Sequence, residues 1–307
     1  LDDIEVHLDA DLLELILNDK VDLIIASATP ETTNPVSDQC ELNGVPCLTS
    51  VAPLEAWFGG RQGDPAKGFD WTYHFFVTAQ RGIASYMSIW NRIETNKKVG
   101  LLLPNDTDGN IFSQMIPGIA RMMGMDDWQI IDPGRFDLPA NNFGAQIGAL
   151  KQAEADSVLI VAPPPDFTVF WNQAAQQGFK PKMLTPSKVG EFPAFMEPMG
   201  DRALNFSIEV WWSRQYPFSS GLTGQTSAEL ADEFEAARKV QAPMTLGFDH
   251  ALYEVAFDVL KRTQDLDKRE SIRDALKSTD YASVTGPVNF GKGPFPNTAE
   301  TPSTGGQ

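Results

Sequence analysis

The chain has 307 residues, a length that accommodates two domains of ordinary size. Hydrophobic residues make up 42% and charged residues 21%, a composition that is typical of globular proteins and excludes disordered and fibrous classes. A formal net charge of −17 opposes binding to the phosphate backbone of nucleic acids or to an anionic membrane surface. The longest apolar runs, such as 157–165, are strand-sized and too short to span a membrane. We therefore expect a soluble protein with no nucleic-acid partner.

Strand-like and helix-like segments alternate along most of the chain, and Gly44 is placed to end one helix in the left-handed conformation. In chain order, the pattern predicts a helix at Asp9–Asp19, a strand at Val21–Ala26, a helix at Asn34–Asn43, a strand at Val45–Ser50, a helix at Ala79–Thr95, a strand at Val99–Pro104, a helix at Ile111–Met123, a strand at Trp128–Pro133, a helix at Phe143–Ala153, a strand at Ser157–Ala162, a helix at Phe167–Gln177 and a strand at Lys182–Thr185.

The alternation of strands and helices is interrupted at Ser207–Thr223, a segment that is aromatic and predicted to be extended. Three further helices are predicted at Ser227–Val240, Phe248–Thr263 and Lys268–Ser278. Beyond residue 283 glycine and proline dominate, and only Gly286–Phe290 has the pattern of a strand.

Apolar strands that alternate with helices indicate parallel sheets covered on both faces, so the expected fold class is α/β with doubly wound sheets. Ligands of such sheets bind beyond the carboxyl ends of the strands. The loops that follow the predicted strands are Ser27–Thr33, Thr49–Pro53, Asn105–Asn110, Pro163–Asp166 and Pro186–Glu191.

Two cysteines, Cys40 and Cys47, exclude a disulfide scaffold or a four-thiolate metal site but permit one bridge. Their spacing does not decide whether they are bridged. The first residues, LDDIEVHLDADLLEL, lack the basic start and the small-residue cleavage site of a signal peptide. These residues fit either a cytoplasmic protein or a processed or truncated chain.

Motifs of catalysis and metal binding are missing from the sequence. The three histidines, His7, His74 and His250, are scattered without metal-ligand spacing, and no HExxH, GxSxG, GxxxxGK[ST] or CxxC occurs. The NDTDGN segment with Asp106 and Asp108 lacks the later glutamate of a calcium loop, and we interpret it as a strand-to-helix turn. We expect no catalytic residues, no metal and no cofactor.

Six strings, in the same order over nearly the whole chain, carry a resemblance to a known family. With them the chain resembles the type I periplasmic binding proteins, the Leu/Ile/Val-binding family of ABC importers. The resemblance implies two lobes joined by three crossover strands, a small-molecule ligand bound between them, an extracytoplasmic or periplasmic location, and the membrane permease of an ABC transporter as partner. The strings are NDKVDLIIAS (18–27), ELNGVPCLTS (41–50), KKVGLLLPNDTDG (97–109), PSKVGEFPAF (186–195), LTGQTSAELADEFEA (222–236) and VTGPVNF (284–290).

Mapped onto this chain, the family fold places residues 1–77 and 213–283 in one lobe and residues 78–212 and 284–307 in the other. The crossovers are expected near Phe76–Thr78, Val210–Trp212 and Ser283–Pro287. Relative to the family, the first strand and helix and the last strands are not recognisable, so the chain is expected to be truncated at both ends. A receptor that presents both lobes to a transporter is expected to be a monomer.

The resemblance also implies how a ligand carboxylate is held. Family members use hydroxyls and backbone N–H groups of the first two loops, where helix N-termini stabilise an anion. The matching residues here are Ser27, Thr29 and Thr49, with the backbone of Val51 and Ala52. The alternative interpretation is that these are ordinary turn and helix-capping residues.

The residues that bind the ligand ammonium in the family are replaced in this chain. Ser187, followed by Lys188, stands where the family has the acid that pairs with the ligand ammonium, and Asp108 and Pro164 replace tyrosines. An unpaired buried ammonium is costly, so the sequence favours a hydrophobic or aromatic organic acid as ligand. Branched-chain amino-acid binding is the alternative, because a small shift of the alignment brings Glu191 to the critical place.

Aromatic residues near the loops and crossovers are candidates for the remaining wall of the pocket, or else belong to the core. Two further functions remain open: a ligand-sensing receptor domain of the same fold, and an α/β enzyme with an unrecognised site. The aromatic candidates are Trp57, Phe76, Trp211, Trp212 and Phe248.

Overall fold

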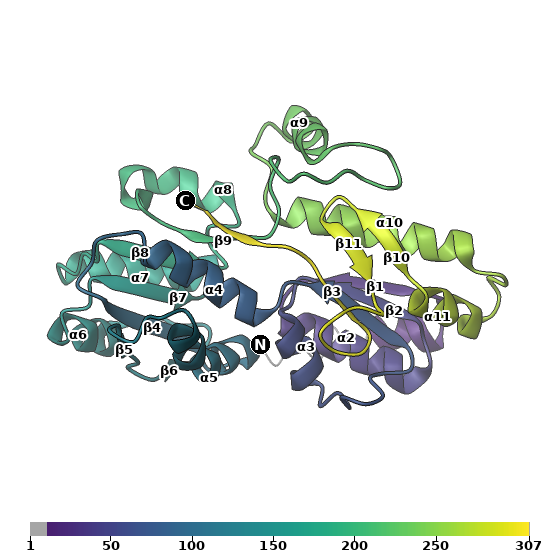
Figure 1. Ribbon diagram of the computed structural model, residues 1–307, viewed down its shortest axis with the longest axis horizontal. Coiled ribbons are helices and arrows are strands. Elements are labelled where there is room, and N and C mark those ends of the chain that lie inside the picture. The colour runs from purple at the N-terminus through teal and green to yellow at the C-terminus, as the bar shows by residue number, and fades with distance from the viewer. Residues whose placement is uncertain (1–10, 307) are drawn as a thin grey trace. The chain divides into compact units, whose positions relative to one another are not determined.

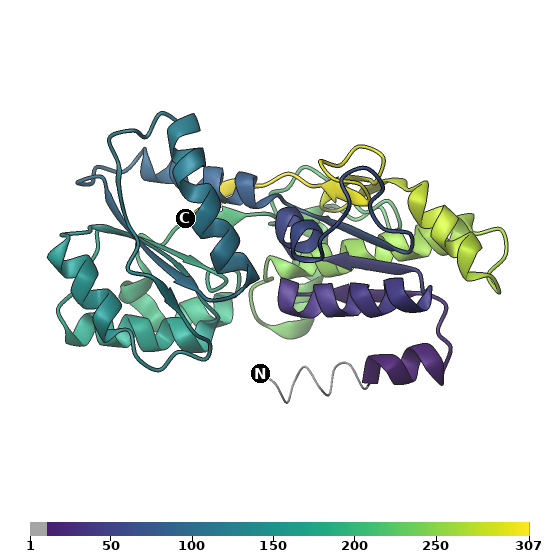
Figure 2. The same cartoon turned by 90° about the horizontal axis from the view of Figure 1, so that it is seen from below.

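The computed structural model describes residues 11–306 (Figures 1 and 2). His7 and the first two residues of the predicted helix Asp9–Asp19 lie outside the described residues, and residues 11–17 are helical. The chain divides into two compact units, which we describe separately. The first contains the described residues as far as Thr78, with Trp211–Glu233 and Thr245–Pro302, and the second contains Ala79–Val210, Phe234–Met244 and the residues from Ser303 onward.

The first unit is built on a parallel sheet in the order β1-β2-β3-β12. Ser27 lies opposite Ser50, Ser50 lies opposite Phe75, and Phe76 lies opposite Glu300, so the carboxyl ends of the four strands share one edge. The strands are β1 (Ile24–Ser27), β2 (Cys47–Ser50), β3 (Thr72–Phe76) and β12 (Thr298–Glu300).

Helices and a hairpin complete the first unit. Helix α2 buries Val36 and Cys40 against Ile24 and Cys47 of the sheet. It ends at Gly44, whose left-handed φ of 63° and N–H bonds to the last carbonyls confirm the predicted helix stop. The elements are α2 (Pro30–Asn43), α3 (Leu54–Gly60), α10 (Thr245–Arg262), α11 (Arg269–Lys277) and the antiparallel hairpin of β10 (Asp280–Ser283) and β11 (Gly286–Asn289); α9 (Ser227–Arg238) begins in this unit.

The second unit has a five-stranded sheet in which β5, β4, β7 and β8 follow one another and β6 pairs with the end of β4, all in parallel. A separate antiparallel pair joins β9 and β13. The strands are β4 (Lys98–Pro104), β5 (Gln129–Ile131), β6 (Arg135–Phe136), β7 (Ser157–Val161), β8 (Met183–Ser187), β9 (Ile208–Val210) and β13 (Thr304–Gly306).

Side chains that alternate along the strands of the second unit bury on opposite faces. Leu101 and Leu159 pack with helices α4 and α5, whereas Leu102 and Val158 pack with α6 and α7. Figures 1 and 2 show these helix pairs on the two sides of the sheet. The predicted doubly wound α/β class is therefore confirmed. The helices are α4 (Ala79–Trp90), α5 (Thr107–Met122), α6 (Gly144–Gln152), α7 (Pro164–Gln176), α8 (Pro193–Met196) and the 3₁₀ segment η1 (Glu197–Ala203).

The C-terminal stretch differs from the sequence prediction. Instead of a crossover, Ser283–Pro287 contains the turn of the β10–β11 hairpin, and residues 284–302 belong to the first unit because β12 pairs with β3. The chain leaves that unit after Pro302, and β13 then pairs with β9 in the second. Strands β12 (TAE) and β13 (TGG) were not predicted, because their short polar and glycine-rich sequences lack an apolar run.

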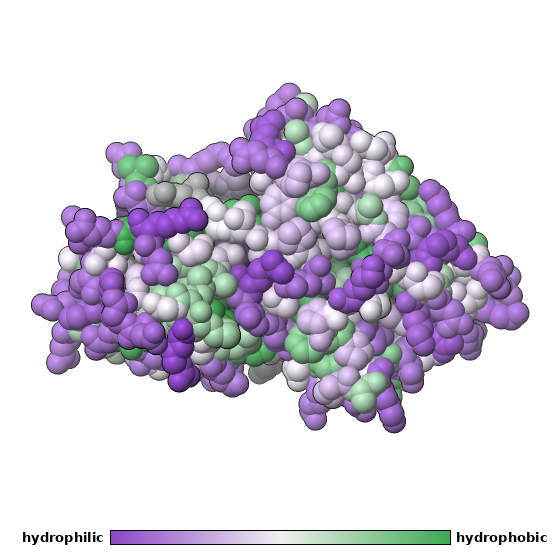
Figure 3. Space-filling model, in the orientation of Figure 1, coloured by the Kyte–Doolittle hydropathy of each residue, from purple (hydrophilic) through white to green (hydrophobic). Residues whose placement is uncertain are grey.

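Hydrophilic side chains cover much of the face drawn in Figure 3. Within the described part of the chain, no helix combines the length and the apolarity that crossing a membrane requires.

Candidate functional site

The strands of the first-unit sheet end at one edge, which we call its carboxyl edge. Ser27, Thr29 and Val51 lie there, and all three are half-buried. Thr29 caps α2 with an extended backbone, but its side chain makes no capping hydrogen bond. The Ser27 hydroxyl donates to the carboxyl group of Asp249 on α10, and partial burial raises the pKa of that carboxyl. Val51 adopts a left-handed φ of 65°, which turns the loop sharply after β2. This edge combines short hydroxyl side chains with the positive end of the α2 dipole, a setting that stabilises an anion, although the Thr32 and Thr33 N–H groups already donate to the Thr29 carbonyl.

The predicted residues Thr49 and Ala52 are fully buried, and both form hydrogen bonds with the ring of His74. The Thr49 Oγ1 lies 2.7 Å from Nδ1 of His74, and the Ala52 carbonyl lies 2.8 Å from its Nε2. With Ala52 accepting, Nε2 carries the proton and Nδ1 accepts from Thr49. Burial lowers the His74 pKa to about 3, so the ring is neutral. These polar groups are therefore satisfied internally.

Trp57 stacks on the His74 ring with centroids 5.0 Å apart and donates from its indole N–H to Ser37 at 3.1 Å. Trp212 is buried and donates to Ser227 at 3.2 Å. Phe248 is buried and packs 4.9 Å from Phe76. These aromatic candidates occupy the core of the first unit, which accounts for them without a ligand.

In the second unit, the carboxyl edge carries a buried ion pair. Lys188, directly after β8, lies 2.6 Å from the Oδ2 of Asp108 in the first turn of α5. The Asp108 side chain is 4% exposed and the Lys188 side chain 19%. Both were predicted site residues, and the structure brings them together. Pro164 lies half-buried at the start of α7.

A hydrogen-bonded chain runs beside this ion pair. The Tyr86 hydroxyl donates to Ser187 at 3.0 Å, and the Ser187 hydroxyl donates to Oε1 of Glu209 at 3.2 Å. The second carboxyl oxygen of Glu209 is buried and has no hydrogen-bond partner among the described residues. Sequence reasoning missed Tyr86 and Glu209, because they lie far from the loops that follow the strands.

Glu191 completes the group that we call the carboxyl cluster: Asp108, Lys188, Glu191 and Glu209. Burial, and then the neighbouring charge of Glu209, raise the Glu191 pKa to about 8, against the lowering effect of Lys188. Burial raises the Glu209 pKa to about 7, although Tyr86 and Ser187 favour its charged form. Near neutral pH much of Glu191 and part of Glu209 therefore hold a proton.

The two cysteines are free thiols in the core of the first unit. The Cys47 thiol contacts Cys40, and this hydrogen bond, with burial, raises the pKa of Cys47 well above its usual range. The bridge that the spacing left open is not formed.

Comparison with known proteins decides the family. The model of a family described as periplasmic binding protein matches residues 10–300. The chain belongs to the periplasmic binding protein family. The family match confirms the resemblance to periplasmic binding proteins, and solved structures of a leucine-binding protein and of a branched-chain amino-acid transporter substrate-binding protein confirm the expected fold. Comparison with curated proteins gives no match.

Solved structures of other periplasmic binding proteins share the fold at low sequence identity. A type 1 protein from Bordetella pertussis Tohama I has a TM-score of 0.79 at 13% identity, over 98% of this chain and 81% of its own. A leucine-binding protein from Thermotoga maritima gives 0.72 at 16% identity, over 93% and 77%. An ABC transporter solute-binding protein from R. palustris, in complex with 4-hydroxybenzoate, gives 0.74 at 14% identity, over 98% and 78%.

Proposed function

We propose that this periplasmic binding protein is the solute-binding component of an ABC importer, and that its ligand is a small organic acid with a hydrophobic or aromatic body. The proposal includes an extracytoplasmic location, a membrane permease as partner, a monomeric state and no catalytic activity. Family membership supports the transport role, since the family match spans residues 10–300. Similar solved proteins include a leucine-binding protein and two solute-binding proteins in complex with isoleucine and with 4-hydroxybenzoate.

The carboxylate of the ligand is assigned to the first-unit edge. Thr29 and the backbone after β2 offer hydroxyl and N–H donors there, and the Ser27 hydroxyl joins them when it turns from Asp249 to the ligand. A helix N-terminus with short hydroxyl side chains stabilises an anion without the cost of a second buried charge.

The ligand class rests on one observation, the Asp108–Lys188 ion pair at 2.6 Å. Because that pair is internally neutral, Glu191 and Glu209 are the remaining acids, and their raised pKa values favour protonated forms. Protonated carboxyls donate and accept hydrogen bonds to hydroxyl or carboxyl groups of a ligand. An ammonium would instead require Glu191 to lose its proton, which makes a zwitterionic amino acid the second candidate.

Calorimetric titration of matched ligands tests both candidates. Phenylpyruvate and phenylalanine share one body and differ in the amine, and 4-hydroxybenzoate and leucine extend the series. We expect binding of the two deaminated acids, with a stabilisation of about 2.7 kcal/mol at 100 times the dissociation constant. Tight binding of leucine alone, with release of a proton to the buffer at pH 7, would reject the organic-acid assignment and support the amino acid.

Substitutions in the first unit test where the ligand carboxylate binds. Ser27→Ala is expected to weaken binding of the responding acid by about tenfold, the loss of one hydrogen bond to a charged group. Ser219→Ala, at an exposed position of the same unit, is the matched control and is expected to bind like the parent. If no ligand of the series binds to the parent protein, the transport assignment itself fails.

A further inference from the structure

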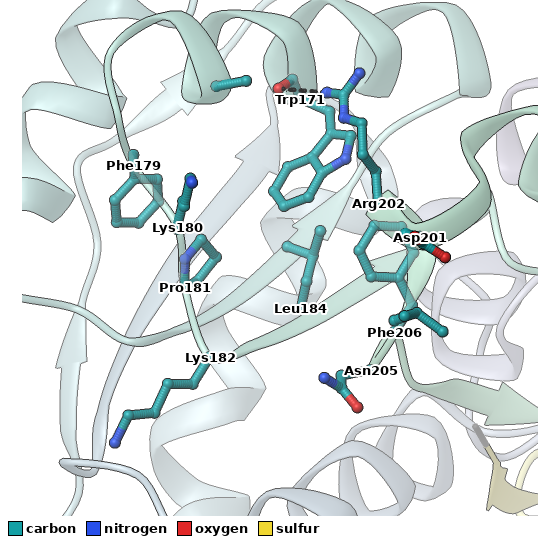
Figure 4. A pocket seen from close by; sticks show the side chains of 12 residues that line it. Trp171, Phe179, Lys180, Pro181, Lys182, Leu184, Asp201, Arg202, Asn205 and Phe206 are labelled. Atoms are coloured by element: carbon teal, nitrogen blue, oxygen red, sulfur yellow. Dashed lines mark hydrogen bonds between the residues drawn. The ribbon is translucent and has the colours of Figure 1, made fainter.

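A cavity of about 330 Å³ lies in the second unit, away from the carboxyl cluster. Figure 4 shows the segment from Phe179 to Lys182 on one side, Arg202 and Phe206 on the other, and Trp171 and Leu184 between them. Lys182 immediately precedes β8, whereas Lys188 follows it, so the cavity lies at the amino end of the sheet. It is distinct from the edge to which ligands of parallel sheets bind.

The cavity has an apolar interior. Phe179, Leu184 and Phe206 are buried, and the rings of Trp171 and Phe206 meet edge to face with centroids 5.5 Å apart. Leu204 at the rim is 67% exposed. Small-molecule sites are concave, mostly apolar and aromatic, with a few polar groups, and this cavity has that character.

Cations gather around the apolar interior. Lys180, Lys182 and Arg202 line the cavity and Asp201 is the one acid among its lining residues, in a chain with a net charge of −17. Lys182 lies 3.6 Å from Asp156 and its side chain remains 62% exposed. A local excess of positive charge in an acidic protein attracts an anion selectively.

Arg202 is held in a fixed position. Its guanidinium donates to the Trp171 carbonyl at 3.1 Å and to the Asn172 side chain at 3.3 Å, and lies 5.7 Å from the centre of the Trp171 ring. A guanidinium fixed in this way offers its remaining N–H groups without further loss of side-chain entropy.

The indole N–H of Trp171 is buried and has no hydrogen-bond partner in the described part of the chain. Figure 4 shows the indole nitrogen on the side of the ring that faces Arg202. A buried donor without an acceptor is unfavourable, and the oxygen of a bound anion would satisfy it.

We infer that this cavity is a second binding site, for a small aromatic carboxylate. The aromatic body packs against Leu184, Phe206 and the Trp171 ring. The carboxylate pairs with the Arg202 guanidinium at the edge of the cavity and accepts the buried indole N–H when the arginine shifts aside, and the lysines of the facing wall add attraction. The site is independent of the carboxyl edges and of the transport role proposed above.

Nuclear magnetic resonance of the indole N–H groups in ¹⁵N-labelled full chain tests this inference, with 2-naphthoate as the probe. Trp171→Phe assigns the Trp171 signal. We expect this signal to move saturably with 2-naphthoate and about tenfold more weakly with the neutral 2-naphthamide. No movement of the signal, or equal response to the amide, overturns the inference.

Variants place the probe in the cavity. Ala175→Phe fills the cavity from the exposed side of α7, and Arg202→Gln removes the fixed cation; each is expected to weaken 2-naphthoate by about tenfold or more. Ala145→Phe on α6 is the matched control outside the cavity, and Ser27→Ala should have no effect. The other tryptophan signals report folding of each variant. Unchanged binding in a folded Ala175→Phe protein contradicts the assignment.

Discussion

The carboxyl edges of the two units bury polar groups in different ways. In the first unit, the neutral His74 ring is bonded to Thr49 and to the Ala52 carbonyl. In the second, the carboxyl cluster combines an ion pair with two acids whose pKa values are raised. A neutral network costs little when it is complete, whereas a charged cluster depends on each partner and on pH. The free energy of unfolding should therefore fall when a charge is removed from the cluster in the second unit. Its dependence on pH should have opposite signs in the two units.

The largest expected effect follows from breaking the buried ion pair. Asp108→Asn removes the carboxylate 2.6 Å from the Lys188 ammonium and should lower the free energy of unfolding by about 3–5 kcal/mol. Asp127→Asn, which removes the exposed partner of Lys97, is the control and should cost at most about 1 kcal/mol. Urea titration measures both. Adding Lys188→Met to Asp108→Asn should recover much of the loss, and equal losses for Asp108→Asn and Asp127→Asn would contradict the picture of a buried pair.

The next effect is the response of the second unit to rising pH. Glu191 has a folded-state pKa of about 8, above its unfolded value, so the native state holds a proton that the unfolded state has lost. Its contribution to stability is full below pH 4.5 and is lost as pH rises toward 8, at up to about 1.4 kcal/mol for each pH unit. Glu191→Gln should flatten the dependence between pH 5 and 8, and the exposed Glu197→Gln should not. The same slope in both variants would remove Glu191 as the cause.

The first unit should respond in the opposite direction. The His74 pKa is lowered to about 3, so between pH 6.5 and 3 the unfolded state binds a proton that the native state does not. Stability is therefore lost as pH falls below 6.5, by about 2 kcal/mol at pH 5. His74→Asn should lose this part of the acid dependence. An unchanged slope between pH 6.5 and 5 would mean that His74 is charged in the native state.

The smallest effect compares two helix starts. Asp106 caps α5 and its side chain accepts from the Gly109 N–H at 2.7 Å, whereas Thr29 caps α2 without a side-chain bond. Asp106→Ala should therefore cost about 1 kcal/mol, and Thr29→Ala less than about 0.5 kcal/mol. Thermal unfolding of both variants provides the measurement. A larger loss for Thr29→Ala would assign the Thr29 hydroxyl to the fold instead of to a ligand.

Strands made of one apolar run could be predicted from the sequence, whereas strands without such a run could not. Strands such as Ser157–Val161 are buried on both faces and consist of one apolar run, so their pattern is unmistakable. β3, with the sequence TYHFF, and β12, with TAE, lack such a run, and β12 is recognisable only through its pairing with a strand more than 200 residues earlier. Local sequence carries no information on that pairing.

Candidate site residues were harder to predict, for a related reason. Trp57 and Phe248 have the same side chains whether they line a pocket or fill a core, and here they pack in the core. Lys188 follows the position where the family has an ammonium-pairing acid, and its own charge is met by Asp108, which lies 80 residues earlier. The partner of a buried charge depends on tertiary structure, so the charge balance of a site cannot be obtained from one loop.

The pairing of β12 with β3 has a consequence for biosynthesis. The sheet of the first unit needs Thr298–Glu300, while the five-stranded sheet of the second unit is complete once Met183–Ser187 has emerged from the ribosome. Closing a loop from residue 76 to residue 298 must wait for nearly the whole chain, and contacts of such long range form slowly. We therefore expect the first-unit sheet to form more slowly than the second-unit sheet, with one side of β3 unpaired until Thr298–Glu300 joins it.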